Sequence, residues 1–93
     1  MPIRSFRCGL TKLLFDGKRV QQFVNIEVVA MRKLAILNRA AALPDLRVPP
    51  GNRLEPMKGD RIGQFSIRIN DQYRICFVWT ATGPEEVEIV DYH

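Results

Sequence analysis

The sequence contains few of the residues from which metal and disulfide sites are built. It has two cysteines and one histidine among 93 residues. Cys8, Cys76 and His93 lack the ligand spacing of a zinc site, and two cysteines are too few for a disulfide scaffold. We therefore expect both thiols to be reduced and structural, and we expect neither a metal nor another cofactor.

Long apolar runs are also missing. No stretch approaches the roughly 18–20 apolar residues that span a bilayer, and the first eight residues lack the apolar core of a signal peptide. These absences predict a cytoplasmic protein with no membrane partner. The chain is 46% hydrophobic and 26% charged, which excludes a disordered polymer and favours one folded domain over residues 1–93.

Basic residues are absent from the end of the chain. Residues 1–80 hold all 14 Lys and Arg residues against six acidic ones, a balance of +8, whereas residues 81–93 carry four acidic residues and a charge of −4. Ten of the 14 basic residues are Arg, whose planar guanidinium grips phosphate with paired hydrogen bonds. This balance favours a polyanionic partner, but composition alone is equally consistent with an incidental pI of 9.5.

The first half of the chain has helical periodicity. Apolar residues at 10–15 are spaced as in a helix that stops near Gly17, and Asn25 is a suitable N-cap for a second helix. That second helix has an apolar face of Ile26, Val29, Ala30, Leu34, Leu37 and Ala41. Prolines end this second helix, so residues 42–52 are expected to form a connector. Residues 2–8 are expected to form a short first strand.

After residue 52 the apolar period changes to two, which indicates strands. A three-residue loop at 70–72 keeps the apolar side chains of the resulting hairpin on one face. The pairs predicted by this loop are Ile69 with Tyr73, Ile67 with Ile75, and Phe65 with Phe77. A further turn at 82–84 leads to a last strand, where Trp79 should pair with Val87 and Phe77 with Ile89.

The predicted fold class is α+β, with two N-terminal helices packed on one face of a twisted antiparallel sheet and the other face open to solvent. The register places Arg68 across from Arg74, and it places Tyr92 on the other side of Arg74. Facing like charges cost up to about 1 kcal/mol unless an anion lies between them. The sequence therefore predicts an anion site, to which Lys58 and Arg61 add charge, although exposed arginines often simply pair with surface acids.

Other chemistry is weakly represented. There is no glycine-rich phosphate loop, and metal-free cleavage of RNA needs a base, a proton donor and cations around the scissile phosphate. His93, Tyr92, Lys58, Arg68 and Arg74 include all these groups, but His93 could equally be a solvated chain end.

Four segments form an ordered set: Leu54-Glu55-Pro56-Met57-Lys58-Gly59-Asp60-Arg61, Gln64 to Asn70, Gln72 to Ile75, and Asp91-Tyr92-His93. Together they are similar to HigB-type toxins, the plasmid-maintenance or host-killing toxins of the RelE/ParE superfamily. The resemblance implies a RelE-like fold and a ribosome-dependent endoribonuclease that cuts mRNA in the A site without metal, leaving 2′,3′-cyclic phosphate and 5′-hydroxyl ends. It also implies a HigA-type helix-turn-helix antitoxin, with operator DNA bound only through the complex.

By position, the resemblance assigns catalytic roles to Lys58, Arg74, Asp91, Tyr92 and His93. It assigns RNA binding to Lys58, Arg61, Arg68, Gln72 and Arg74. Some members carry a histidine where this chain has Glu55, so Glu55 is a candidate substitute acid or base. Two alternatives stay open: a non-catalytic RNA- or ribosome-binding module, and a degenerate toxin retained as an antitoxin-binding protein.

Overall fold

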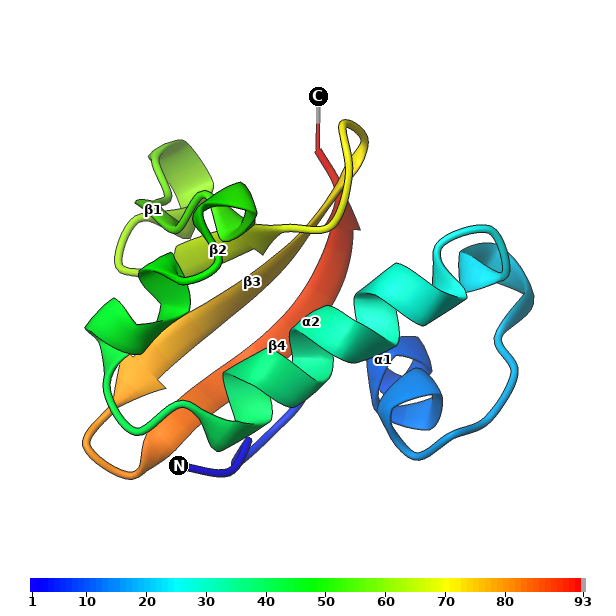
Figure 1. Ribbon diagram of the computed structural model, residues 1–93, viewed down its shortest axis with the longest axis horizontal. Helices are drawn as coiled ribbons and strands as arrows, with labels where there is room; N and C mark the ends of the chain where they lie inside the picture. The colour runs from blue at the N-terminus through cyan, green and yellow to red at the C-terminus, as the bar shows by residue number, and fades with distance from the viewer. Residues whose placement is uncertain (93) are drawn as a thin grey trace.

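A computed structural model describes residues 1–92 of the chain. These residues form the α-helices α1 (Gly9–Phe15) and α2 (Glu27–Arg39) and the strands β1 (Glu55–Pro56), β2 (Phe65–Arg68), β3 (Tyr73–Thr80) and β4 (Gly83–Asp91). The strands make one antiparallel sheet in the order β1-β2-β3-β4 (Figure 1). The predicted α+β class is confirmed.

The helices follow the predicted periodicity with one error. The chain leaves α1 at Gly17, which has a φ of 90° and donates its N–H to the carbonyl of Leu14 at 2.9 Å. The N-cap of α2 is Ile26 and not the predicted Asn25. A 3₁₀ helix at Gln21–Phe23 precedes it, and the buried Ile26 bonds to the carbonyl of Phe23, so packing sets the start of α2.

Two segments differ from their predictions. Residues 2–8 are not a strand: they run beside β4 through one isolated parallel bridge between Phe6 and Val87. Glu86, with a φ of 54°, bends β4 there, so a regular ladder cannot continue. The connector at 42–52 contains two 3₁₀ helices, Leu43–Arg47 and Pro50–Asn52, each with a proline in its first turn.

The predicted register of the hairpin is confirmed. Phe65 faces Phe77, Ile67 faces Ile75, and Arg68 faces Arg74. The loop is held by Asn70, whose Oδ1 accepts the backbone N–H groups of Gln72 at 2.8 Å and Tyr73 at 2.7 Å. This Asx-type turn fixes the three-residue loop that the sequence indicated.

The predicted register between β3 and β4 is wrong by two residues at Ile89 and by three residues near the turn, where Trp79 faces Pro84 and not Val87. Ile75 faces Ile89, and Thr80 faces Gly83, so the turn is shorter than expected. A β-bulge between Cys76 and Val78 also shifts the pairing. Ile75 and Ile89 keep the predicted apolar face because the shift is even on their side of the bulge, but Val90 and not Tyr92 lies opposite Arg74.

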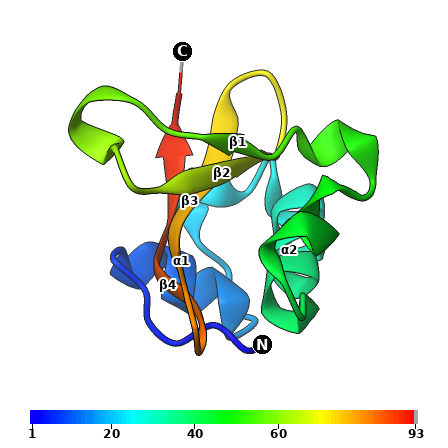
Figure 2. The ribbon, with the colours of Figure 1, turned by 90° about the vertical axis from the view of Figure 1, so that its left-hand side faces the viewer.

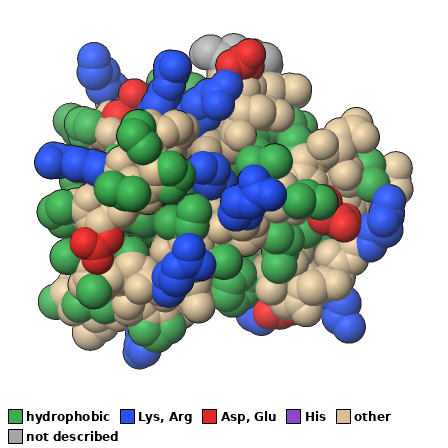
Figure 3. Space-filling model, viewed as in Figure 1, with side chains coloured by type: hydrophobic (Ala, Val, Ile, Leu, Met, Phe, Trp, Pro, Cys, Tyr) green, Lys and Arg blue, Asp and Glu red, His purple; other side chains and the backbone are tan. Residues whose placement is uncertain are grey.

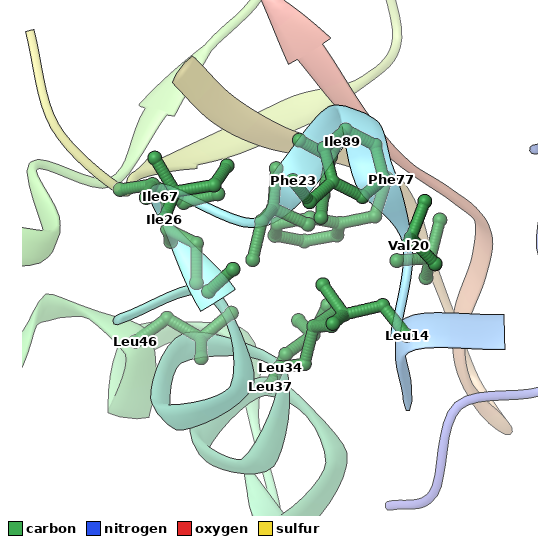
Figure 4. Close-up of a cluster of buried hydrophobic side chains, with 14 of the residues drawn as sticks. Leu14, Val20, Phe23, Ile26, Leu34, Leu37, Leu46, Ile67, Phe77 and Ile89 are labelled. Carbon is green, nitrogen blue, oxygen red and sulfur yellow. The ribbon is translucent and has the colours of Figure 1, made fainter. Parts of the chain in front are cut away.

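The core is one cluster of buried side chains from both helices and from the sheet. Figure 4 shows Leu34 and Leu37 of α2 beneath Phe77 and Ile89, with Leu14 of α1 beside them. Leu34, Leu37 and Phe77 are completely buried. Each such side chain contributes roughly 1.5–3 kcal/mol by leaving water, so these contacts fix the sheet that carries the polar residues described below. Among residues 1–92, no helix is both long and apolar enough to cross a membrane.

The second face of the sheet is covered around Ser66, Cys76 and Arg74, contrary to the prediction that the whole face is open to solvent. Ser66 and Cys76 are completely buried there, and Arg74 is only 8% exposed. Groups from the segment between the Pro50–Asn52 helix and β2 cover it: the carbonyl of Arg53 bonds to Arg74, and Arg61 reaches Glu88. Figure 2 shows this segment and the β1–β2 hairpin at the upper end of the sheet. The polar groups around Arg74 therefore form a covered network.

Candidate functional site

Arg74 is the centre of the polar network on the second face. Its Nε donates to Ser66 Oγ at 2.8 Å, and its Nη2 donates to the carbonyl of Arg53 at 2.7 Å. The same Nη2 lies 3.5 Å from Glu55 Oε1. Ser66 is the diagonal cross-strand neighbour of Arg74, so the confirmed register of β2 and β3 brings them together. A buried guanidinium thus holds the segment that carries Glu55.

A hollow of about 340 Å³ lies beside this network. It is lined by Glu55, Pro56, Lys58 and Tyr92. β1 supplies Glu55, the start of the following 3₁₀ helix supplies Lys58, and the residue after β4 supplies Tyr92. Tyr92 is distant in sequence from Glu55 and Lys58, yet all three side chains meet at one rim. The hollow presents a carboxylate, an ammonium and an aromatic ring.

The end of β4 is tied to the hairpin loop. Gln72 Nε2 donates to Asp91 Oδ2 at 3.0 Å, and the carbonyl of Gln72 accepts the N–H of Tyr92 at 2.7 Å. These two bonds set the direction in which the chain leaves the sheet, which places Tyr92 at the hollow. His93, the remaining member of the predicted catalytic triplet, lies outside the described residues.

Arg68 faces Arg74 from β2, as predicted, but it has a surface partner. Its Nη2 bonds to Asp71 Oδ1, and the side chain of Asp71 is 100% exposed. Such a solvated pair is weak and exchanges readily with other anions. Arg68 is therefore available to a phosphate at the edge of the site, whereas Arg74 is largely engaged by the protein.

Arg61 does not line the hollow. Its Nη1 donates to Glu88 Oε1 at 2.9 Å and to Gln64 Oε1 at 3.2 Å. The hydrogen bond to Glu88 raises the pKa of Arg61 further above its ordinary value, and burial acts in the opposite direction. Because Arg61 closes the short 3₁₀ helix that follows Lys58, its bond to Glu88 fastens the Lys58 segment to β4.

Cys76 lies between these charged groups on the buried face. Burial raises the pKa of its thiol, and the Arg61 guanidinium partly offsets this rise. Both cysteines are free thiols, as expected. A buried thiol with a raised pKa is a poor nucleophile, so Cys76 fills space beneath the ion pair of Arg61 and Glu88.

Of the residues nominated from the sequence, the structure brings Glu55, Lys58 and Tyr92 together around the hollow, and Arg74 lies 3.5 Å from Glu55. Their roles in catalysis and RNA binding stay predictions. The hydrogen bonds that Arg53, Ser66 and Glu88 make in the support of the site were not predicted. The contact between Ser66 and Arg74 could have been predicted, because the pairing of β2 with β3 places both residues on the same face of the sheet. The backbone carbonyl of Arg53 left no signal in the sequence.

The arrangement suits chemistry on a phosphodiester. The carboxylate of Glu55 can accept a proton, the ammonium of Lys58 can stabilise negative charge on phosphate oxygens, and the ring of Tyr92 can stack on a base. Within residues 1–92, no group of three His, Cys, Asp or Glu side chains is placed to hold a metal ion.

Comparison with known proteins places the chain in a family. Residues 5–93 match the family described as RelE-like toxin of type II toxin-antitoxin system HigB. Toxin HigB-1 of Vibrio cholerae serotype O1 is 53% identical over 55 residues, which cover 59% of this chain and 58% of that protein. An uncharacterised protein of Haemophilus influenzae is 38% identical over 53 residues, which cover 57% of this chain and 52% of that protein.

The chain thus spans little more than half the length of these curated relatives, whereas the family match extends over almost all of it. The resemblance drawn from the motifs at 54–75 and 91–93 is confirmed. This chain belongs to the HigB-like family of RelE-like toxins of type II toxin–antitoxin systems.

Proposed function

We propose that this protein is a toxin that cuts mRNA in the ribosomal A site, in the cytoplasm and without a metal ion. The observation that carries the proposal is the convergence of Glu55, Lys58 and Tyr92 around one hollow above the buried Arg74. Membership of the HigB-like family of RelE-like toxins supports the same activity, because the resemblance to that family implies an endoribonuclease.

The proposed reaction is attack of an RNA 2′-oxygen on the adjacent phosphorus. The O2′–P bond forms and the P–O5′ bond breaks, which gives a 2′,3′-cyclic phosphate and a 5′-hydroxyl end. Glu55, whose Oε1 lies 3.5 Å from Arg74 Nη2, takes the proton of the 2′-hydroxyl. His93, which lies outside the described residues, gives a proton to the leaving 5′-oxygen.

The remaining residues hold the substrate. Lys58 stabilises the charge on the phosphate oxygens, Arg74 adds a fixed positive charge from beneath, and Tyr92 stacks on a base. Arg68 binds a neighbouring phosphate by exchanging its contact with Asp71. Gln72 and Asp91 position Tyr92 through the two contacts at the end of β4.

Mapping new 5′ ends on mRNA bound to translating ribosomes tests this proposal. The native protein should produce discrete cuts with 5′-hydroxyl ends in the presence of a chelator, once the ribosomes have been programmed and the excess magnesium replaced by polyamine. Lys58→Gln should remove the cuts, whereas Lys18→Gln, which removes an exposed ammonium beyond α1, should not. Binding to ribosomes without any cut would favour the non-catalytic module instead.

We also propose a partner, a HigA-type helix-turn-helix antitoxin through which the complex binds operator DNA. Expression of this chain alone should arrest growth, and co-expression of the antitoxin should restore it. Growth arrest that persists with the antitoxin bound, or no arrest by the native chain, would contradict the proposed pairing.

A further inference from the structure

Lys33 carries positive charge from α2 toward the candidate site. Its Nζ donates to Asn52 Oδ1 at 2.5 Å. Asn52 is completely buried, and its Nδ2 donates to the carbonyls of Leu46 at 3.1 Å and Val48 at 3.2 Å. Because this amide is fixed, the ammonium of Lys33 is held in one place beside residue 53. An ammonium has three donors and Asn52 takes one, so two remain for a ligand.

Arg53 adds a second cation at the same place. It adopts the left-handed conformation, with φ 45° and ψ 56°, and its carbonyl accepts Arg74 Nη2 at 2.7 Å. This conformation is unfavourable for a bulky residue, and such strain is concentrated in functional segments. The side chain of Arg53 is exposed. The protein thus fixes the backbone of Arg53 and leaves its guanidinium to the solvent.

Arg68 completes a basic strip with these two residues. Arg68 faces Arg74 across β2 and β3, and Arg74 bonds to Arg53, which follows Asn52 in the chain. Burial lowers the pKa of Lys33, and the guanidiniums of Arg32 and Arg68 lower it further. Figure 3 shows Lys and Arg side chains on this face of the molecule, over α2 and the upper part of the sheet. Mutually repelling cations of this kind are stabilised by an anion with several charges.

We propose that the basic strip, Lys33, Arg53 and Arg68, binds successive phosphates of an RNA backbone that passes beside the hollow. The inference rests on the proposed function and adds a subsite to it. Lys33 and Arg53 act as point charges on phosphate oxygens and read no base, so the strip binds RNA irrespective of sequence. The phosphates can belong to the mRNA strand or to ribosomal RNA, and the test below separates these two sources.

The test uses a double variant, Lys33→Gln with Arg53→Asn, because asparagine tolerates the left-handed conformation of residue 53. The matched control is Lys18→Gln with Arg19→Gln. It removes the same charge from two exposed residues after α1, on the right in Figure 1 and away from β1 and β2. Lys33→Arg with native Arg53 keeps the charge and should bind like the native protein. Thermal unfolding verifies that each variant is folded. If loss of the Lys33–Asn52 contact prevents the double variant from folding, the single variant Arg53→Asn replaces it in the test.

Binding is measured against salt concentration for two partners. One is a single-stranded RNA with 2′-O-methyl groups, which cannot be cleaved because the attacking hydroxyl is blocked, and the other is the vacant ribosome. Removal of one cation that neutralises a phosphate reduces the slope of log affinity against log salt by about 0.7, so the slope of the double variant should fall by about 1.4 with one of these partners. A change with the oligonucleotide assigns the phosphates to mRNA, and a change with the vacant ribosome assigns them to ribosomal RNA.

The proposal is overturned if the double variant and the control have equal slopes with both partners, or if the native protein binds neither. Cleavage of ribosome-bound mRNA by the native protein is recorded in parallel. Cleavage with unaltered slopes would reject the basic strip and leave the proposed function standing. A changed slope without cleavage would support the strip as an RNA subsite and reject the endoribonuclease.

Discussion

Replacement by lysine should lower the free energy of unfolding far more at Arg74 than at the facing Arg68. Arg74 and Arg68 lie directly opposite each other, but Arg74 is buried and bonds to Ser66 and the Arg53 carbonyl, whereas Arg68 pairs with a fully exposed carboxylate. Lysine keeps the charge at either position. Its single ammonium cannot reach both Ser66 Oγ and the Arg53 carbonyl, which the two separate nitrogens of Arg74 bind.

The magnitude follows from the hydrogen bond that Arg74→Lys removes. A hydrogen bond to a charged donor is worth about 1.5–3 kcal/mol, so we expect the free energy of unfolding to fall by about 2 kcal/mol. The contact with Glu55, whose side chain is 49% exposed, adds little to this loss. For a domain of this size, a loss of about 2 kcal/mol lowers the melting temperature by about 8–16 °C.

Urea and thermal unfolding of the two variants measure this difference. Arg74→Lys should lower the urea midpoint without a change in the m-value, and Arg68→Lys should leave both close to native. Equal losses at the two positions, or no loss at Arg74, would refute the view that Arg74 is the buried support of the site.

Three further predictions concern the support of the site and its turn. Glu88→Gln should weaken the bond to Arg61 and speed amide exchange at residues 59–63, because that bond fastens the Lys58 segment to β4; unchanged exchange there would contradict this role. Burial raises the pKa of Cys76, so above about pH 8.5 the unfolded chain loses a proton that the native state keeps. The free energy of unfolding should therefore fall as pH rises, and Cys76→Ala should make this fall less steep. An identical pH dependence in the variant would contradict the assignment. Asn70→Ala removes the acceptor of two backbone N–H groups in the hairpin loop and should lower the free energy of unfolding by about 1 kcal/mol in urea titrations, a cost that a merely exposed loop residue would not show.

The parts of the fold that could be predicted are those with a strong local pattern. The apolar period of α2 and the alternation in β2 and β3 defined these elements, and the need to keep Ile67 and Ile75 on one face selected the correct register. The register of β4 failed because its bulge depends on Glu86 and on the neighbouring residues 2–8, which are distant in sequence. A one-dimensional pattern does not contain that contact.

The candidate site also has a part that could be predicted from the sequence and a part that could not. Lys58, Tyr92 and Glu55 carry distinctive chemistry, so their side chains could be nominated from the sequence before their convergence was known. The enclosure of Arg74 could not, because it depends on a backbone carbonyl at Arg53 and on the crossing of Arg61 to Glu88. The expectation of an open basic face therefore assigned to Arg74 an exposure that its partners remove.

The most direct test of the central claim, that the hollow around Glu55 is where RNA is cut, is the single-turnover rate of mRNA cleavage on ribosomes saturated with each variant. Glu55→Gln keeps the shape of the side chain and removes the proton acceptor, so the rate should fall by about 10²–10⁴-fold. Glu86→Gln removes an equal charge from an exposed position on β4 and should cut at the native rate. Equal rates for the two variants would contradict the claim.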